Sequence, residues 1–370
     1  MSFKIAIRPN IRQSVFFDAT VADGVQSFGV YNHMLIPEHF GDIDAEYQNL
    51  LTNVVMWDVA VQRQVQLKGP DAAKLAQYLT PRNLEKARIG QGRYVPLCDH
   101  DGWMINDPVL LKISEECYWL SVADSDIHLW AAATGKERGW AVEVDEPDVS
   151  PLAIQGPKAM DLAVKLFDES VREMRYFAFK EAELDGMPLI LARAGWSKQG
   201  GFELYLCDGS RGTELYEKVK EAGAEFGIGP GAPNHLERME HGLISYGTDM
   251  RWQSHRANPF EMGLGALVDL ESGHDFVGRK ALAQIKQEGP KRLRVGFKID
   301  GMPKPLGRSM PIELGGQEVG CMSEFLFSER VGTTIGVGLV KSELAESTDE
   351  FTLKHDTGHH SARITPMPFL

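Results

Sequence analysis

The sequence predicts an α+β fold that ends in a separate all-β domain. The chain has 370 residues, more than one ordinary hydrophobic core encloses, so two or three domains are expected. Strand and helix patterns alternate through about the first 285 residues. After that, short strands separated by turn residues follow one another without a long helix. We therefore predict an α+β core over residues 1–285 and a β-domain over residues 286–370.

The composition is that of a folded, acidic protein. Hydrophobic residues make up 43% of the chain and charged residues 25%. The 39 Lys and Arg residues against 52 Asp and Glu residues give a formal net charge of −13. A chain this acidic is a poor partner for a phosphate backbone, so we expect no nucleic-acid partner.

Nothing in the sequence predicts a membrane segment or a metal centre. No apolar stretch reaches about 18 residues and no signal-peptide core follows Lys4 and Arg8, so we expect a cytoplasmic chain without a membrane partner. His359-His360 lacks a third ligand at metal spacing, which favours a solvated loop. The four cysteines have no Cys-x-x-Cys spacing and are expected to be free thiols: Cys98, Cys117, Cys207 and Cys321.

The N-terminal region contains a candidate binding segment. The apolar run from Phe28 to Pro37 is interrupted by Tyr31, Asn32 and His33, which indicates a strand ending in a polar loop. Both a binding site and an ordinary strand end with satisfied polar side chains fit this pattern. A helix over Tyr47–Val55 and a strand over Val61–Leu67 are predicted next.

The sequence contains two similar units, each with a strand, a Gly-Pro pair and a helix, and these suggest an internal structural repeat. Leu67-Lys-Gly-Pro-Asp-Ala-Ala leads into a helix that ends near Leu79. Leu152-Ala-Ile-Gln-Gly-Pro leads into another helix about 90 residues later. Between them, a helix is predicted over Asp126–Ala133.

Asp107 is the candidate catalytic residue. The turn residues Asp99 to Gly102 predict a hairpin that joins strands over Tyr94–Cys98 and Pro108–Ile113, with a third strand over Tyr118–Val122. Asp107 lies between apolar residues in this hairpin, and Pro108 holds it extended. A carboxylate there must be paired, hydrogen-bonded or functional, and a turn aspartate bonding its own backbone is the alternative.

A second candidate site lies in a glycine-bounded loop. Strands over Leu189–Ala194 and Phe202–Leu206 flank Gly195 to Gly201. Trp196, Lys198 and Gln199 crowd this loop, and Glu203 and Tyr205 face the same side of the returning strand.

The C-terminal part begins with helices and ends in strands. Helical spacing runs from His235 to Tyr246, with Arg238 among its polar residues, and again from Ala281 to Lys286. The strands expected beyond them are Arg294–Ile299, Met310–Leu314, Val319–Leu326, Thr333–Val340, Phe351–Lys354 and Ser361–Ile364.

Common catalytic motifs are missing from the sequence. There is no dinucleotide-binding Gly-x-Gly-x-x-Gly after a strand, no Walker A motif and no Gly-x-Ser-x-Gly elbow. A set of aromatic and acidic residues remains, for which an ordinary aromatic core is the alternative reading: Tyr31, Tyr94, Asp107, Trp196, Glu203, Tyr205 and Trp252. Aromatic faces bind flat heterocycles and cations, and a carboxylate can accept two N–H bonds from an amino-pyrimidine edge such as that of a pterin.

Six segments in order resemble the aminomethyltransferase (glycine cleavage T-protein) superfamily. Gly102-Trp-Met-Ile-Asn-Asp resembles its Gly-Gly-x-x-Asp-Asp, and Ile154-Gln-Gly-Pro-Lys-Ala resembles its Gln-Gly-Pro-x-Ala. Arg193-Ala-Gly-Trp-Ser-Lys-Gln-Gly-Gly-Phe-Glu is similar to Arg-Thr-Gly-Tyr-Thr-Gly-Glu-x-Gly-Tyr-Glu. The other three segments begin at Met56, Asn258 and Asp275.

The resemblance implies a three-domain, cloverleaf-like fold in which two interlocked α+β units and a C-terminal β-barrel surround a central folate channel. It also implies a tetrahydrofolate-dependent methyltransferase in which tetrahydrofolate accepts the methyl group. Asp107 would act at N5 and Glu203 would hold the pterin edge, with Tyr94 and Tyr205 as neighbours and Arg238 as a candidate for the folate glutamate carboxylate.

The glycine-bounded loop departs from the family pattern, because Trp196-Ser-Lys-Gln replaces Tyr-Thr-Gly-Glu. We therefore expect a methyl donor different from the aminomethyl-lipoyl carrier of glycine cleavage. Together with Tyr31-Asn-His-Met-Leu and Asn106-Asp-Pro, the loop looks like the branch that demethylates dimethylsulfoniopropionate. Tyr31, His33, Trp196, Ser197 and Lys198 are then the candidate donor-binding residues. A glycine-cleavage aminomethyltransferase, a demethylase of betaine-type donors and a folate-binding protein without catalysis are the alternatives, as a monomer or homodimer.

Overall fold

The computed structural model describes residues 9–305, 307–356 and 358–370. The chain forms two compact units, each assembled from separate stretches of sequence. Unit 1 comprises the residues up to Ala73 together with Ala87–Arg93 and Val109–Asn234. Unit 2 comprises Lys74–Lys86, Tyr94–Pro108 and His235–Leu370. The domain boundary predicted between residues 285 and 286 stays a prediction.

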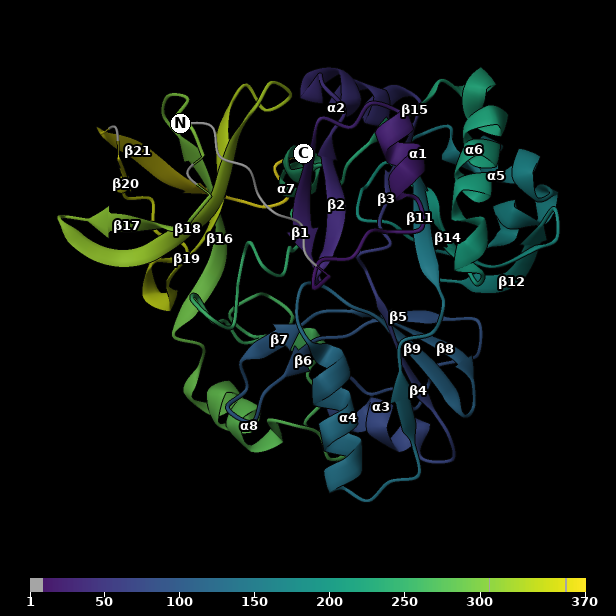
Figure 1. The fold of residues 1–370 in the computed structure, drawn as a ribbon. Coiled ribbons are helices and arrows are strands. Elements are labelled where there is room, and N and C mark those ends of the chain that lie inside the picture. Colours follow the sequence, from purple (N-terminus) through teal and green to yellow (C-terminus); the bar gives the residue numbers. More distant parts are fainter. Residues whose placement is uncertain (1–8, 306, 357) are drawn as a thin grey trace. The chain divides into compact units, whose positions relative to one another are not determined.

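Unit 1 contains a six-stranded sheet in the order β12-β13-β14-β11-β3-β15 and a five-stranded sheet in the order β10-β4-β9-β8-β5 (Figure 1). A two-stranded sheet, β1-β2, completes it. Neighbouring strands of the six-stranded sheet are antiparallel except for β15 and β3, which are parallel. The strands are β1 (Ser27–Tyr31), β2 (Met34–His39), β3 (Val54–Asp58), β4 (Gln64–Lys68), β5 (Gly92–Tyr94), β8 (Val109–Ser114), β9 (Cys117–Ser121), β10 (Glu143–Asp145), β11 (Ser150–Gln155), β12 (Phe179–Leu184), β13 (Met187–Ala192), β14 (Gly201–Leu206) and β15 (Ile228–Gly231).

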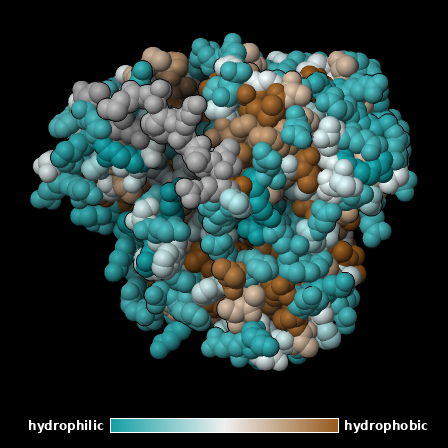
Figure 2. Space-filling view, in the orientation of Figure 1, coloured by the Kyte–Doolittle hydropathy of each residue, from teal (hydrophilic) through white to brown (hydrophobic). Residues whose placement is uncertain are grey.

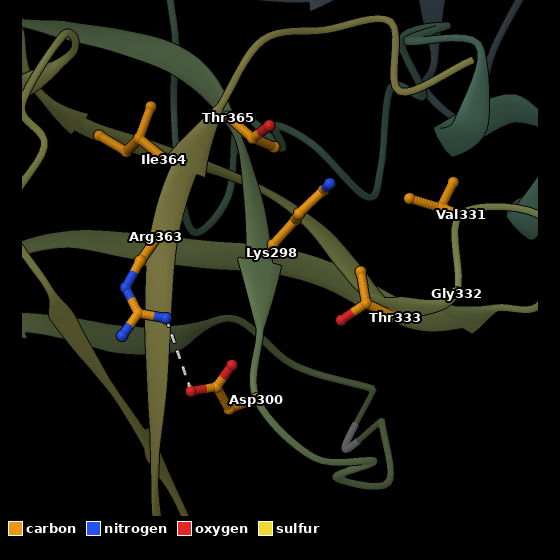
Figure 3. A pocket seen from close by; sticks show the side chains of 8 residues that line it. All are labelled: Lys298, Asp300, Val331, Gly332, Thr333, Arg363, Ile364 and Thr365. Atoms are coloured by element: carbon orange, nitrogen blue, oxygen red, sulfur yellow. Dashed lines mark ion pairs between the residues drawn. The ribbon is translucent and has the colours of Figure 1, made fainter.

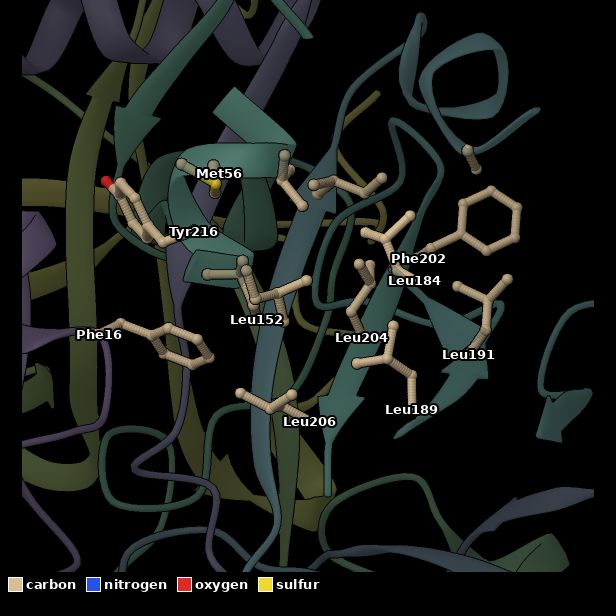
Figure 4. Packing of buried hydrophobic residues seen from close by; sticks show 14 of the residues in the cluster. Phe16, Met56, Leu152, Leu184, Leu189, Leu191, Phe202, Leu204, Leu206 and Tyr216 are labelled. Carbon is tan, nitrogen blue, oxygen red and sulfur yellow. The ribbon is translucent and has the colours of Figure 1, made fainter. Parts of the chain in front are cut away.

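The main core of unit 1 lies on one face of the six-stranded sheet, where α5 and α6 pack (Figure 4). Phe202, Leu204 and Leu206 of β14 point into this core. Because strand residues alternate between faces, Glu203 and Tyr205 are placed on the opposite face. The helices of unit 1 are α1 (Phe17–Ala22), α2 (Ile43–Thr52), α4 (Ile127–Glu137), α5 (Ala159–Leu166), α6 (Gly212–Gly223) and the short 3-10 turns η1 (Glu169–Glu173), η2 (Gly209–Arg211) and η3 (Ala224–Phe226).

The two Gly-Pro units share one local structure. β4 leads into α3 (Ala72–Leu79) and β11 leads into α5, with the same three-residue connection. Gly69 and Gly156 begin these connections with φ of +133° and +128°. A Cβ atom would lie 2.7 Å from the carbonyl oxygen of Ala141 at Gly69 and 2.3 Å from that of Asn53 at Gly156. Only glycine fits both the conformation and the space.

Unit 2 contains a closed barrel in the order β16-β19-β18-β17-β20-β21, which confirms the all-β C-terminal region (Figure 1). Its interior is filled by apolar side chains such as Phe297, Phe325 and Phe351. Before the barrel come a hairpin of β6 (Leu97–Cys98) and β7 (Met104–Asn106), then α7 (His235–Glu240), η4 (Gly265–Leu267) and α8 (Arg279–Glu288). The barrel elements are β16 (Arg292–Ile299), β17 (Met310–Leu314), β18 (Gln317–Ser328), β19 (Thr333–Lys341), η5 (Ser342–Leu344), β20 (Phe351–His355) and β21 (Gly358–Thr365).

The turn predicted at Asp99 to Gly102 and the strands predicted over Pro108–Ile113 and Tyr118–Val122 are confirmed, but the single strand predicted over Tyr94–Cys98 is wrong. The N–H of Asp99 donates to the carbonyl of Trp103 at 2.9 Å, and Gly102 has a φ of +83°. The segment Tyr94–Cys98 contains the last residue of β5 and the whole of β6, because Pro96 lies between the two strands and has no N–H for a ladder. β8 lies between β9 and β5 in the five-stranded sheet, whereas β6 pairs with β7, so the expected pairing is found at β5 and not at Leu97–Cys98.

Two predicted helices have different limits. The helix expected over Tyr47–Val55 begins earlier, at Ile43, and Val54 already belongs to β3. Asp42 caps the helix, because its side chain accepts from the N–H of Ala45 at 3.0 Å. The helix expected to reach Tyr246 ends at Glu240. Gly242, with a φ of +68°, terminates it, and the N–H of Leu243 returns to the carbonyl of Arg238 at 2.8 Å.

Hydrophilic side chains cover most of the face shown in Figure 2, in keeping with the high charge content. Among the described residues, no helix is long and apolar enough to cross a membrane.

Candidate active site

Asp107 follows β7 directly and is the residue at which the β6–β7 hairpin ends. Its N–H donates to the side-chain oxygen of Asn106 at 3.0 Å, and Asn106 is fully buried. The carbonyl of Pro108 accepts from the N–H of Val95 at 2.9 Å. The backbone on both sides of Asp107 is therefore fixed, and its partly exposed carboxyl group is held in one place.

The phenol of Tyr94 donates a hydrogen bond to the Asp107 carboxylate, with 2.8 Å between Oη and Oδ2. The pKa of Asp107 is raised to about 7, mainly by burial; the Tyr94 hydrogen bond lowers it and the negative charge of Asp249 raises it. Burial and the negative charge of Asp107 raise the pKa of Tyr94 well above its usual value, so the phenol keeps its proton. Asp107 is therefore a carboxyl group that can take up or release a proton near neutral pH.

Arg238 is buried and already paired with two carboxylates. Its Nη1 donates to Oδ1 and Oδ2 of Asp249 at 2.8 and 2.9 Å, and its Nη2 donates to Glu324. Arg294 pairs with the same Asp249 at 3.1 Å. The predicted role of Arg238 in binding a folate carboxylate stays a prediction.

Glu203 and Tyr205 lie together on β14, as their spacing predicts. The phenol of Tyr205 donates to Oε2 of Glu203 at 2.7 Å, and both side chains are buried. Burial raises the pKa of Glu203, and the Tyr205 bond partly offsets this. The side chain of Ser121 hydrogen-bonds to Tyr205, which places Ser121 in the same cluster. A buried carboxylate that accepts from the Tyr205 phenol has further lone pairs that can accept N–H bonds.

Gln155 holds the glycine-bounded loop in place. Its amide donates to the carbonyl of Ala194 at 3.1 Å, and its Oε1 accepts from Ser197 at 2.8 Å. Gly195 and Gly201 pass so close to Gln155 that a Cβ atom at either position would lie within 2.1 or 2.4 Å of its amide. Ser197 is buried, Trp196 is half-buried and Lys198 is exposed. Gln155 was not among the predicted site residues, although its Gln-Gly-Pro motif marks it.

Asn32 and His33 form the two-residue turn between β1 and β2, with φ of 48° and 60°. Asn32 is buried and tied down, since its N–H donates to Asp124 at 2.8 Å and its amide to the carbonyl of Val61 at 3.0 Å. His33 is exposed and lies 3.3 Å from the Asp126 carboxylate. Tyr31 precedes the turn and is half-buried.

Trp252 lies in unit 2, as do Asp99 and Arg256. The indole N–H of Trp252 donates to Oδ2 of Asp99 at 2.7 Å, and the guanidinium of Arg256 lies 4.2 Å from the centre of the Trp252 ring. Trp252 therefore contacts the turn that precedes Asp107.

A cavity of about 400 Å³ opens at the barrel, lined by residues of β16, β19 and β21 (Figure 3). Arg363 in its wall pairs with Asp300 at 3.7 Å and also with Glu350, so its charge is neutralised. Within the described part of the chain, no group of three His, Cys, Asp or Glu side chains is arranged to hold a metal ion.

Two family models match the chain. The GCVT N-terminal domain matches residues 16–272, and the glycine cleavage T-protein C-terminal barrel domain matches residues 292–370. Together they span both units.

Individual relatives agree with the family models. The chain is 40% identical over 330 residues to dimethylsulfoniopropionate demethylase DmdA of Ruegeria pomeroyi, covering 89% of each chain. It is 31% identical over 346 residues to an aminomethyltransferase of Listeria monocytogenes, covering 90% of this chain and 91% of the relative. The fold matches the crystal structure of the glycine cleavage system aminomethyltransferase T from Bartonella henselae, with a TM-score of 0.84, 21% identity and coverage of 97% and 98%.

Proposed function

The chain belongs to the glycine cleavage T-protein family, and on this basis we propose that it is a tetrahydrofolate-dependent methyltransferase that demethylates dimethylsulfoniopropionate. The observation that supports this donor is the 40% identity to the Ruegeria demethylase over 89% of both chains. The departure of the loop at Trp196-Ser-Lys-Gln from the aminomethyltransferase pattern supports the same choice.

In the proposed reaction, N5 of tetrahydrofolate attacks the sulfonium methyl carbon as the carbon–sulfur bond breaks. The sulfur leaves as the neutral thioether of methylmercaptopropionate, and the positive charge passes to N5. Loss of the N5 proton then gives 5-methyltetrahydrofolate. A sulfonium methyl is already activated, so the enzyme's main task is alignment, which can lower a barrier by about 7–11 kcal/mol at the limit.

We assign Asp107 to the proton at N5. Its carboxylate stabilises the charge that develops on that nitrogen and then accepts the proton, directly or through water. A pKa of about 7 suits this task, because the group is ionised in a large fraction of molecules at neutral pH and still accepts a proton readily.

We assign Glu203 to the amino-pyrimidine edge of the pterin, with Tyr94 and Tyr205 as neighbours and Arg238 retained as a prediction for the glutamate carboxylate. Glu203 fits this role because it is buried, has a raised pKa and bonds to the Tyr205 phenol. Two N–H bonds from a pterin supply the donors that such a carboxylate needs.

We assign the donor to the N-terminal turn and the glycine-bounded loop. The half-buried ring of Trp196 offers a face for the sulfonium, while Tyr31, His33, Ser197 and Lys198 are the polar candidates for the rest of the donor. Lys198 and His33 are the candidates for the donor carboxylate.

The test is to incubate the protein with tetrahydrofolate and one methylated donor at a time. Formation of methylmercaptopropionate and 5-methyltetrahydrofolate in equal amounts supports the proposal. Turnover of a betaine-type donor instead assigns a different demethylase. Methylene transfer from an aminomethyl-lipoyl carrier supports the second candidate, an aminomethyltransferase, which the Listeria relative favours. Folate binding without turnover of any donor leaves a binding protein.

We further propose that the protein works in the cytoplasm as a monomer or homodimer. Light scattering of the purified protein distinguishes these two states, and a tetramer or larger assembly contradicts both.

A further inference from the structure

The side chain of Gln155, at the end of β11, holds the glycine-bounded loop, residues 195–201, from inside unit 1. Gln155 is fully buried. Its Nε2 donates to the carbonyls of Ile154 and Ala194, at 3.1 Å each, and its Oε1 accepts from the hydroxyl of Ser197 at 2.8 Å. One amide group therefore ties the backbone just before the loop to the middle of the loop.

The contacts of the Gln155 amide fix which way round it lies. A glutamine amide donates only from its nitrogen and accepts only at its oxygen. Turning the amide over would bring its oxygen against the two carbonyl oxygens that now accept from Nε2. Gly195 and Gly201 pass so close to the amide that it has no space to move aside. The hydroxyl of Ser197 is therefore the donor in its bond to Gln155.

The single proton of the Ser197 hydroxyl is used inside the fold. It goes to Gln155, and Oγ accepts from the N–H of Gln199 at 3.3 Å. Ser197 is 4% exposed. A carboxylate on a methyl donor accepts hydrogen bonds and needs a donating group, and the hydroxyl of Ser197 has no second proton to offer it.

The residues on either side of Ser197 are more exposed than Ser197 itself. Trp196 is half-buried and Lys198 is exposed. Under the proposed function these two side chains offer an aromatic face for the sulfonium and a positive charge for the donor carboxylate. Both leave the backbone next to Ser197, so the bond between Ser197 and Gln155 fixes the segment from which they project.

We propose that Gln155 is a positioning residue for the methyl donor, and that it acts by clamping the loop through Ser197. Ser197 then serves the donor through the loop and not by direct contact. Because the clamp orders the loop before the donor arrives, less conformational freedom is lost on binding. The inference rests on the proposed function for the identity of the donor, whereas the clamp itself can be measured without any donor.

Gln155→Met removes the amide from a side chain of similar length, and Ser197→Ala removes the hydroxyl. We expect each substitution to raise KM for dimethylsulfoniopropionate about fivefold or more and to change kcat by less than about threefold. The Kd for tetrahydrofolate, measured by calorimetry, is expected to stay within about twofold of wild type. A general loss of structure would instead lower kcat and weaken both ligands.

Two further variants test whether the two residues act through one bond. Ser197→Thr keeps a hydroxyl and introduces the residue of the family pattern, so KM is expected to return to within about twofold of wild type. In the double variant Gln155→Met/Ser197→Ala, KM is expected to be close to that of Gln155→Met alone, because either substitution already breaks the shared bond.

A second readout needs no turnover. Lys198 is exposed and is followed by Gln199, so trypsin can cut between them when the loop opens. The rate of such cleavage in the native protein follows the population of the open loop. Mass spectrometry of the peptide that begins at Gln199 is expected to show cleavage about fivefold faster in Ser197→Ala than in wild type, and faster still in Gln155→Met.

Gln66→Met is the matched control. Gln66 on β4 is a half-buried glutamine whose side chain accepts from the indole of Trp119 at 2.9 Å and donates to Asp145 at 3.0 Å. It belongs to the five-stranded sheet, whereas the loop joins two strands of the six-stranded sheet. This variant is expected to leave the donor KM and the cleavage after Lys198 as in wild type.

The outcomes separate the clamp from the proposed function. If cleavage after Lys198 rises in Ser197→Ala but the wild-type protein turns over no donor, the clamp stands and the proposed function fails. If wild type demethylates the donor and Ser197→Ala leaves its KM within about twofold, the inference alone is wrong. Equal cleavage in wild type and Ser197→Ala also contradicts it. If Gln155→Met fails to fold, the comparison of Ser197→Ala with Ser197→Thr decides the question.

Discussion

At the scale of single residues, Asp107 and Glu203 are two carboxyl groups in contrasting surroundings. Asp107 is partly exposed, bonded by Tyr94 and has a pKa of about 7. Glu203 is buried among strand residues and bonded by Tyr205. Asp107 is suited to exchanging a proton, and Glu203 is suited to accepting N–H bonds from a ligand. Both are carboxylic acids, so the difference comes from their exposure and their neighbours.

Asp107→Asn preserves the shape of the side chain and removes its charge. We expect kcat to fall by about 10²-fold or more, because the amide cannot accept the N5 proton. Steady-state kinetics with tetrahydrofolate and the donor measure the effect, and calorimetric donor binding and circular dichroism are expected to match wild type. A kcat within about threefold of wild type corresponds to a change in activation free energy of less than roughly 1 kcal/mol. That result would assign Asp107 a structural role in the turn and no catalytic role.

Glu203→Ala leaves the pterin edge without its acceptor. If the pair is buried in the complex, the loss in folate affinity is expected to be about 2–5 kcal/mol. Isothermal titration with tetrahydrofolate measures it. Glu181→Ala, an exposed residue on β12 of the same sheet, is the control and is expected to bind normally. Equal affinity in both variants removes Glu203 from the folate site.

The sequence predicts residues whose signal is local. Glu203 and Tyr205 share a face because strand side chains alternate, and the structure joins them with a hydrogen bond. Asp107 is marked by the acid between apolar residues and the proline after it. Asp249 could not be identified in this way, because Arg238 lies 11 residues before it, Arg294 lies on the later strand β16, and the three side chains meet only in the folded unit.

At the scale of elements, the glycine-bounded loop shows how backbone geometry prepares a site. Gly201 has a φ of +154°, and a Cβ atom there would lie 2.2 Å from the carbonyl oxygen of Ile154. Gly200 has a φ of +82° but open space around a Cβ atom. The loop is therefore pressed against β11 at one glycine and free at the next.

Gly201→Ala and Gly200→Ala separate the effect of the positive φ, which both glycines have, from the effect of the close approach to β11, which only Gly201 makes. Both substitutions strain the backbone, which costs about 1–2 kcal/mol. Only Gly201→Ala also forces β14 away from β11, two residues before Glu203. We expect Gly201→Ala to lower the unfolding temperature clearly more than Gly200→Ala and to weaken folate binding at least about tenfold. Thermal denaturation and titration calorimetry compare the two, and equal effects contradict a role for the close approach.

Element types were easier to predict than their pairing. The Gly-Pro units and the barrel strands follow from local patterns. The segment over Tyr94–Cys98 was predicted as one strand paired with β8, but it is divided between β5, which neighbours β8, and β6, which pairs with β7. The turn signal at Asp99 to Gly102 specifies a hairpin but not how far its strands extend, and Pro96 interrupts the strand. The helix after His235 was predicted too long because its apolar spacing continues past Gly242, where the backbone leaves the helix.

At the scale of the whole molecule, one buried acid affects stability without any place in the proposed reaction. Asp58 at the end of β3 is 3% exposed. It accepts from the hydroxyl of Ser14 and from the N–H of Ala60, the latter at 3.1 Å. Burial raises its pKa from 3.8 to about 6. The folded state therefore prefers the protonated acid, and this contribution to stability is lost as pH rises toward and past 6.

Asp58→Asn removes the free-energy cost of burying an ionised carboxylate at high pH. The amide of the new side chain keeps one acceptor for the N–H of Ala60 and one donor for the hydroxyl of Ser14. Above pH 7 we expect the variant to be more stable by about 3 kcal/mol, the free energy of a shift from 3.8 to about 6. Below about pH 3 the difference should vanish, because the wild-type acid is then protonated in both the folded and the unfolded state. Urea unfolding at both ends of this range measures it. A constant difference at all pH values contradicts the assignment to ionisation.

The interleaving of the two units has a consequence for synthesis on the ribosome. The hairpin that presents Asp107 belongs to unit 2, whose largest stretch begins only at His235. Met104 donates to the carbonyl of Ala257, and Gly102 lies against Leu282, so the hairpin's partners emerge about 150 residues or more after it does. While unit 1 is completed, the nascent chain carries this segment without its permanent contacts. A fragment that starts at His235 lacks Asp107 altogether, and a chain that stops before Ala257 has Asp107 on a hairpin without its contacts to Ala257 and Leu282.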